Sequence, residues 1–96
     1  MPEIHFKIQW PDGKPETCYS PSLIVKEYFS PNSEYKLEDF VMRSRTALNI
    51  ASDRVLAKYG MPCSRALGQL RQIETAASAY QHFPDPKVQF LQFIEN

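Results

Sequence analysis

The chain begins with a regular alternation of apolar and polar positions. Single polar residues separate four apolar ones: Ile4, Phe6, Ile8 and Trp10. This period of two is typical of a strand with one buried face. The next residues, Pro11-Asp12-Gly13, supply a fixed φ and then a residue that tolerates positive φ, which favours a reversal of the chain. We therefore predict a β-hairpin over about 3–20.

A helix start follows the hairpin, at Ser20-Pro21-Ser22. The hydroxyl of Ser20 can accept a hydrogen bond from an unpaired backbone N–H, and Pro21 suits the first helical position because its missing N–H costs nothing there. Pro31 disfavours helix at the residue before it. The sequence predicts a short helix over about 21–29, capped by Ser20.

Two longer amphipathic segments occupy the middle of the chain. Apolar residues recur at steps of three and four along 37–59 and again along 66–80, the spacing of one face of a helix. Gly60 can end the first segment in a left-handed cap. We predict helices over about 38–59 and 62–81, packed as an antiparallel hairpin.

The C-terminal segment is a short apolar run after Pro84 and Pro86. Its β-branched and aromatic content favours a strand over about 87–95, although apolar side chains fall on both of its faces. The predicted fold class is therefore α+β, with β-β-α-α-α-β order in a single domain over 1–96. The helices are expected to cover one face of a three-stranded sheet.

Composition and charge narrow the classes of function. Apolar residues make up 43% of the chain and charged residues 23%, as in ordinary globular domains. Eleven basic and eleven acidic side chains give a formal net charge of zero, so we expect no nucleic acid partner. No apolar run approaches the roughly 18 residues of a spanning helix, and the N-terminus lacks a secretion pattern. We expect a cytoplasmic protein without a membrane partner, in which Cys18 and Cys63 stay as thiols.

Residues that could carry chemistry are few. His5 and His82 stand at opposite ends of the chain without a second ligand at metal spacing, so no metal is expected. The three glycines form no phosphate-binding motif, and no cofactor is expected. Cys63 opens a predicted helix, where the helix dipole favours a nucleophilic thiolate. No histidine lies near it in sequence, so a structural role is favoured for Cys63 and also for Cys18, a strand residue.

The long predicted helix has two polar margins. Arg45 and Ser52 are seven residues apart on one edge of the apolar stripe, and Arg43, Arg54 and Lys58 gather on the opposite edge. Arginine binds carboxylates and other anions through its planar fork. These margins are candidates for an anion or a partner's carboxylates, with ordinary solvated helix faces as the alternative.

Five short motifs carry a family resemblance: "WPDG", "CYSPS", "SRTAL", "ASDRV" and "KYGMPCS", in that order. Together they resemble the small bacterial family of nitrogen starvation response proteins, with similarity from Pro2 to about Ala77. Genes of that family lie in clusters with a nitrilase-type enzyme, a radical S-adenosylmethionine protein, an acetyltransferase-like protein and a flavoprotein. The resemblance implies a role in nitrogen assimilation from nitriles or cyanide, and it implies no catalytic residues.

The five motifs and the two margins define the candidate contacts for a ligand or partner: Cys18, Ser20, Ser22, Arg45, Ser52, Arg54, Lys58, Cys63 and Ser64. Two hypotheses follow. In the first, the chain is a non-catalytic accessory or regulatory protein that binds a pathway enzyme, or a second copy of itself, through its helical face or a sheet edge. In the second, it is a small enzyme or small-molecule-binding protein in which Cys63 is the nucleophile and Arg45 or Arg54 orients an anionic substrate.

Overall fold

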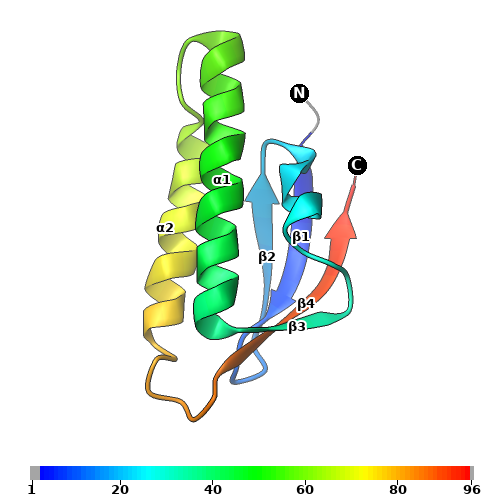
Figure 1. Cartoon of the computed structure of the whole chain (residues 1–96), viewed down its shortest axis with the longest axis vertical. Coiled ribbons are helices and arrows are strands. Elements are labelled where there is room, and N and C mark those ends of the chain that lie inside the picture. The colour runs from blue at the N-terminus through cyan, green and yellow to red at the C-terminus, as the bar shows by residue number, and fades with distance from the viewer. Residues whose placement is uncertain (1–2, 96) are drawn as a thin grey trace.

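The computed structural model describes residues 3–95 and contains an antiparallel sheet with two helices packed on one of its faces (Figure 1). The strands, in the spatial order β2-β1-β4-β3, are β1 (Ile4–Gln9), β2 (Pro15–Ser20), β3 (Ser33–Lys36) and β4 (Lys87–Ile94). The helices are α1 (Leu37–Tyr59), α2 (Ser64–Ser78) and a short 3₁₀ segment, η1 (Leu23–Glu27). The α+β class is confirmed.

The predicted hairpin forms from β1 and β2. Their register runs from Ile4 opposite Ser20 to Gln9 opposite Pro15. The turn is closed by the N–H of Gly13, which donates to the carbonyl oxygen of Trp10 at 2.8 Å. Gly13 has a φ of +90°, a conformation that a residue without a Cβ adopts at little cost. In β1 every second residue is buried, so the predicted single buried face of this strand is confirmed.

A fourth strand, β3, was not predicted. It pairs antiparallel with β4, so that Tyr35 lies opposite Val88. The chain then enters α1 without a loop, and the N–H of Leu37 donates to the carbonyl oxygen of Pro86 at 3.0 Å. The sheet thus has one strand more than the predicted β-β-α-α-α-β order allows. Strand β3 has only four residues, which are too few to show a hydrophobic period in the sequence.

The helix predicted over 21–29 is the shorter η1, and Ser20 does not cap it. Ser22 is the N-cap: its backbone is extended, and its Oγ accepts a hydrogen bond from the N–H of Ile24 at 3.2 Å. Ser20 is still paired with Ile4 as the last residue of β2, which holds it outside the helix start. The prediction that Ser20 is the cap is wrong for this reason.

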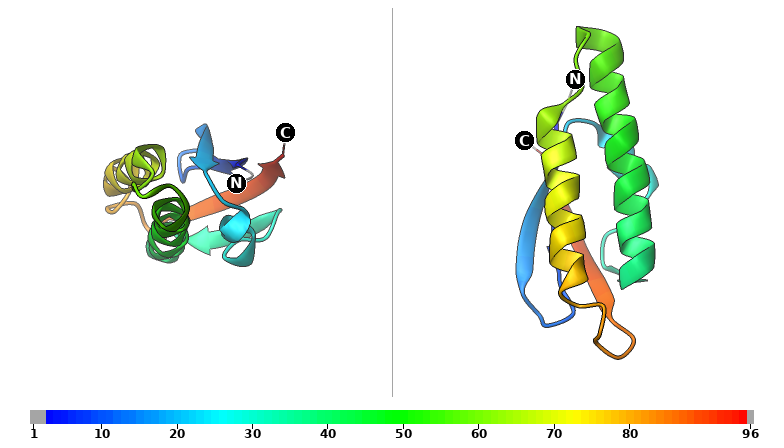
Figure 2. Two further views of the ribbon diagram at one scale, coloured as in Figure 1. Left: turned by 90° about the horizontal axis from the view of Figure 1, so that it is seen from above. Right: turned by 90° about the vertical axis from the view of Figure 1, so that its left-hand side faces the viewer.

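The two long helices form the predicted antiparallel hairpin (Figure 2). Helix α1 ends as expected at Gly60, which has a φ of +80° and donates its N–H to the carbonyl oxygen of Leu56 at 2.8 Å. Helix α2 is shorter than the predicted 62–81. Its first helical residue is Ser64, and hydrogen-bonded turns replace the helix after Ser78. Within residues 3–95, no helix is both long and apolar enough to cross a membrane.

Aromatic rings fill the core between the helices and the sheet. Phe90 of β4 stacks on Phe6 of β1 and on Phe29, with ring centroids 5.6 and 4.8 Å apart. Phe40 of α1 packs against Phe29 at 5.4 Å. Phe29 lies two residues after the end of η1, and Val25 within η1 is also buried, so this short segment adds to the core beside α1.

A register shift in β4 explains why its sequence pattern was ambiguous. Phe90 lies opposite Ile8 and Phe93 lies opposite Phe6, so two residues three positions apart both face the core. The extra residue between the two pairs is a β-bulge. The carbonyl oxygen of Leu91, within this bulge, accepts the N–H of Asn32 at 3.2 Å. The bulge thereby places apolar residues of both parities on one side of the strand.

Both edges of the sheet are protected against pairing with another strand. On β2, Pro15 has no N–H to donate, and the N–H of Tyr19 is taken by Oε1 of Gln69 from α2 at 3.0 Å. The opposite edge, β3, is only four residues long and carries Glu34 and Lys36. Short, charged or covered edges are the usual means by which proteins prevent strand addition.

Candidate functional site

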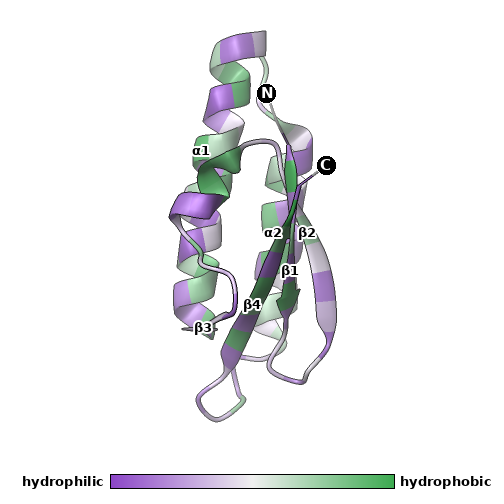
Figure 3. Ribbon diagram, turned by 90° about the vertical axis from the view of Figure 1, so that its right-hand side faces the viewer, coloured by the Kyte–Doolittle hydropathy of each residue, from purple (hydrophilic) through white to green (hydrophobic). Residues whose placement is uncertain are grey.

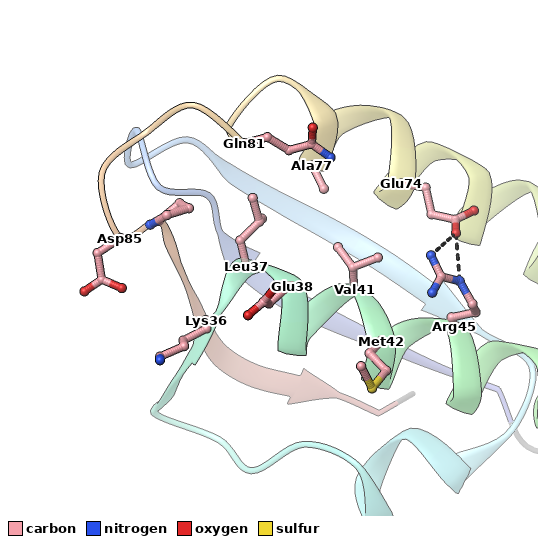
Figure 4. A pocket seen from close by; sticks show the side chains of 11 residues that line it. Lys36, Leu37, Glu38, Val41, Met42, Arg45, Glu74, Ala77, Gln81 and Asp85 are labelled. Atoms are coloured by element: carbon pink, nitrogen blue, oxygen red, sulfur yellow. Dashed lines mark hydrogen bonds and ion pairs between the residues drawn. The ribbon is translucent and has the colours of Figure 1, made fainter.

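A groove with a volume of about 780 Å³ lies where the start of α1 meets the end of α2 and the loop that leads to β4 (Figure 4). This volume is in the range of natural ligand sites. The groove is lined by Lys36, Leu37, Glu38, Val41, Met42, Arg45, Glu74, Ala77, Gln81, Asp85 and Pro86. We refer to it as the helix groove.

The floor of the helix groove is apolar. Leu37 and Val41 project from α1 toward Ala77 on α2 (Figure 4). Leu37 and Ala77 are buried, whereas Met42 on the rim is 61% exposed. A methionine fills irregular gaps and adapts to different contact surfaces because its side chain is flexible and polarisable. The floor can therefore accept an apolar side chain from a binding partner.

An ion pair crosses one end of the helix groove. Arg45 donates from Nε and from Nη2 to Oε2 of Glu74, at 3.0 and 2.7 Å. Both side chains are substantially exposed, 52% for Arg45 and 39% for Glu74, so the pair contributes only about 0.2–1 kcal/mol to folding. No other hydrogen bond joins the guanidinium to residues 3–95. Arg45 can thus donate to a ligand while it keeps Glu74.

The remaining rim charges are of both signs. Lys36 and Glu38 flank the start of α1, and Asp85 lies 3.3 Å from the ammonium of Lys87. The hydrogen bond that Lys87 donates to Asp85 and the charge of that carboxylate, together with Glu34, raise the pKa of Lys87 above its usual value. A rim of balanced charge is a poor site for a simple ion. It suits a ligand with an apolar part and a polar part.

Ser20, Ser22 and Arg54 do meet, at the junction between β2 and η1. The Oγ of Ser22 accepts from Nη1 of Arg54 at 3.0 Å and from the N–H of Ile24. Ser20 Oγ donates to the carbonyl oxygen of Ser22 at 2.8 Å and accepts its N–H at 3.3 Å. Both serines are buried and hydrogen-bonded to the chain itself. These three candidates therefore hold the junction together and lie outside the helix groove.

Ser52 and Cys63 form a second local contact. Ser52 Oγ accepts the N–H of Cys63 at 3.2 Å, which ties the start of α2 to the side of α1. Ser52 is only 3% exposed, so the prediction that it shares the exposed margin of Arg45 is wrong. Cys63 is partly exposed as the N-cap residue of α2, and Ser64 after it is exposed. Lys58 is exposed in the last turn of α1.

Cys18 is a buried thiol in β2. Its Sγ donates weakly to Oε2 of Glu16 at 3.7 Å. Burial, and then the neighbouring carboxylate, raise the pKa of Cys18 far above the usual value of a thiol. Cys18 is therefore protonated at neutral pH and is unsuited to nucleophilic attack. Within residues 3–95, no group of three side chains is arranged to hold a metal ion.

The nine candidate residues therefore lie in several separate parts of the structure and do not line one pocket. Only Arg45 lines the helix groove. Sequence reasoning missed Met42 and Glu74, which complete its rim. Met42 had a detectable signal, since a methionine beside the apolar stripe of a helix is expected to be exposed. Glu74 had none, because it meets Arg45 from 29 positions away.

Comparison with known proteins gives one match. The family model described as "Nitrogen starvation-induced protein NitG" matches residues 5–93. The match extends past Ala77, where the resemblance was expected to end, and it includes most of β4. No curated protein and no solved structure matches the chain.

Proposed function

Because the chain belongs to the nitrogen starvation-induced NitG family, we propose that it is a non-catalytic accessory or regulatory protein that binds an enzyme of the same response. The proposed partner is an enzyme of nitrile or cyanide assimilation, such as the nitrilase-type enzyme that the family resemblance implies is encoded in the same gene cluster. Family membership supports the setting of nitrogen starvation.

The observation that carries the proposal is the exposure of Met42 on the rim of the helix groove, beside its apolar floor. Met42 is 61% exposed beside Val41, which is itself only partly covered. Burying a methionine side chain completely contributes about 1.5–3 kcal/mol. A partner that inserts an apolar side chain here would gain much of that free energy. It could also accept hydrogen bonds from Arg45 through a carbonyl or carboxylate oxygen.

The protected sheet edges favour the helical face as the binding surface. An added strand would need free N–H and C=O groups along an edge. On β2, Pro15 has no N–H and Gln69 occupies the N–H of Tyr19. On β3 the edge is short and flanked by charges. A segment that lies along the helix groove requires none of these backbone groups.

The test uses the purified nitrilase-type enzyme of the cluster and isothermal titration calorimetry. We expect the wild-type chain to bind it, and Met42→Glu to weaken binding at least tenfold, since it places a carboxylate on the apolar contact (about 1.4 kcal/mol or more). Gln92→Glu is the matched control, because Gln92 is exposed in β4 opposite Lys7, away from the groove. Equal binding by Met42→Glu and wild type, or no binding to any enzyme of the cluster, would refute the proposal.

The alternative function, an enzyme that uses Cys63, is favoured by one observation. Cys63 is partly exposed immediately before the first turn of α2, and its side chain makes no capping hydrogen bond. Its proposed helpers are placed less favourably: Arg45 lies in the helix groove, and Arg54 is bonded to Ser22. Iodoacetamide at pH 6 distinguishes the two functions. Alkylation of Cys63 much faster than that of free cysteine would support the enzyme hypothesis. A rate equal to that of free cysteine would exclude it.

A further inference from the structure

The side of α1 that faces away from the sheet carries a regular stripe of exposed residues (Figure 2). The stripe consists of Met42, Arg45, Asn49, Asp53 and Leu56. At about 100° of helical turn per residue, the other four residues lie within about 40° of Asn49 around the axis of α1. All five therefore share one face of the helix. We call these five residues the outer stripe.

The outer stripe has an exposed apolar residue at each end. Met42 is 61% exposed and Leu56 is 44% exposed, and they are two of the five large apolar residues that are exposed in the described chain. Figure 3 shows hydrophobic and hydrophilic bands alternating along α1. Asn49 lies midway, seven residues from each, which is the spacing by which helices pack along one another. A single asparagine in such a repeat can fix the register of the helix pair.

The charges of the outer stripe are placed evenly about Asn49. Arg45 lies four residues before it and Asp53 lies four residues after it. Arg45 donates from Nε and Nη2 to Glu74, and a guanidinium has further N–H groups to donate. Asp53 forms no ion pair with any of residues 3–95. The stripe therefore offers one donor and one acceptor of opposite charge.

We propose that two copies of the chain associate through the outer stripe, with their α1 helices antiparallel and a two-fold axis beside Asn49. In this arrangement, residues equally far before and after Asn49 come to the same height on the two helices. Met42 of one copy then lies level with Leu56 of the other, and Arg45 lies level with Asp53. Each pairing occurs twice, as a self-complementary two-fold contact requires.

The charge pattern favours this arrangement over a parallel one. A parallel pair in register would place Arg45 against Arg45 and Asp53 against Asp53, which is repulsive. In the antiparallel register, Glu38 falls level with the uncharged Gly60 of the other copy. Arg45 and Asp53 are the only charged residues of α1 that this register places level with a charge, and that charge is opposite. The sheets lie behind the helices and would stand on the outer sides of the dimer (Figure 2).

The dimer would share residues with the helix groove. Met42 and Arg45 belong to the outer stripe and also line the groove. Self-association and enzyme binding would therefore exclude each other, so that the monomer is the form that binds the enzyme. Only this competition rests on the proposed function, and the dimer itself does not.

The experiment is sedimentation equilibrium on the purified chain. We expect a reversible monomer–dimer equilibrium for wild type. Arg45→Glu and Asp53→Arg, each alone, should raise the dissociation constant of the dimer roughly tenfold, because each dimer loses two ion pairs and gains two repulsions. An equimolar mixture of the two variants should form mixed dimers as tight as wild type, since the two changed charges then face each other and so do the two unchanged ones. Lys58→Glu is the matched control, because it lies on the opposite side of α1 from Asn49.

Disulfide cross-linking tests the direction of the helices. In a Cys63→Ser background, a Met42→Cys chain mixed with a Leu56→Cys chain should form a mixed disulfide on oxidation. Met42→Cys alone should cross-link poorly, because the two thiols of an antiparallel dimer are about 21 Å apart along the helices. Efficient self-cross-linking by Met42→Cys would overturn the antiparallel register.

Two further results would overturn the proposal: a wild-type chain that stays monomeric at millimolar concentration, or a mixture of variants that associates no better than its components. Leu56→Glu separates the dimer from the proposed function, since Leu56 does not line the helix groove. This variant should abolish the dimer without lowering the affinity for the enzyme. Enzyme binding without a dimer, or a dimer without enzyme binding, would reject one proposal and leave the other.

Discussion

Arg54 donates a hydrogen bond from Nη1 to Oγ of Ser22 at 3.0 Å, which joins α1 to the N-cap of η1 across 32 positions of sequence. The same hydroxyl oxygen accepts the N–H of Ile24. One serine thus starts a helix and fixes that helix to its neighbour. The contact links two of the motifs that carry the family resemblance, "CYSPS" and "ASDRV".

Ser22→Ala should lower the free energy of unfolding by about 0.5–2 kcal/mol, because it removes the cap of η1. It also removes the partner of Arg54. Urea unfolding of Ser22→Ala, Arg54→Ala and the double variant tests the coupling. We expect the double variant to lose less than the sum of the single losses, as residues in contact do. Strict additivity would show that the Arg54 contact contributes nothing.

Ser20→Asp and Ser22→Asp should differ sharply in stability. Ser20 is completely buried in β2 and hydrogen-bonds to the backbone of Ser22 rather than to Arg54, so a carboxylate there would be buried without a hydrogen-bonded cation, and we expect a loss of about 3–5 kcal/mol. At Ser22 the carboxylate still caps η1 and gains an ion pair with Arg54, so stability should stay close to that of wild type. Thermal melts of both variants measure the difference. Similar melting temperatures would contradict the assignment of the cap to Ser22.

Ser44→Ala should stabilise the protein. Ser44 is 1% exposed in α1, and its Oγ has no hydrogen-bond partner among residues 3–95. A buried polar group without a partner costs about 1–3 kcal/mol, and alanine is also the better helix former. Urea unfolding should show a gain of about 1 kcal/mol. Ser52→Ala is the matched control on the same helix: its Oγ accepts the N–H of Cys63, so its loss should destabilise.

The two thiols should react in two separate phases. Both cysteines are free, but Cys18 is buried with a raised pKa, whereas Cys63 is partly exposed. Ellman's reagent at pH 8 should modify one thiol of the native chain, and the second only after denaturation. Cys63→Ser should abolish the first phase and leave the second intact. Two thiols of equal reactivity in the native chain would contradict the burial of Cys18.

Asp12 should make stability depend on acid pH. The N–H of Lys14 and then the hydroxyl of Tyr80 donate to its carboxylate, and they lower the pKa of Asp12 below its usual 3.8. Because the pKa is lower in the folded state, this contribution to stability is present above pH 3.8 and is lost as the pH falls through the folded value. Asp12→Ala should therefore melt below wild type at pH 7, and the difference should shrink toward pH 2. A constant difference would show that the charge has no role.

The elements that were predicted correctly carry their signal within a few residues. The alternation in β1, the turn at Gly13, the stripe of α1 and the cap at Gly60 all depend on neighbouring positions. The elements that were missed depend on distant partners. Strand β3 exists because β4 pairs with it, and the bulge in β4 is set by its pairing with β1.

The same distinction holds for the candidate site. Two serines, Ser20 and Ser22, were equally able to cap a helix, and only the pairing of Ser20 with Ile4 in the sheet decides between them. Arg45 could be singled out from its place on the helix, but not its pairing with Glu74, which requires the packing of α1 on α2. The type of side chain therefore predicted which residues were able to cap a helix or form an ion pair. Tertiary contacts decide which of them do so.

The closed edge of β2 has a consequence for how copies of the chain meet one another. A flat, open strand at that edge would let copies add to one another and grow into fibres. Gln69 and Pro15 prevent this, at the cost of one side chain from α2 and one missing N–H. Replacing both residues would leave the core unchanged but would open the edge of β2 to pairing with a strand of another copy.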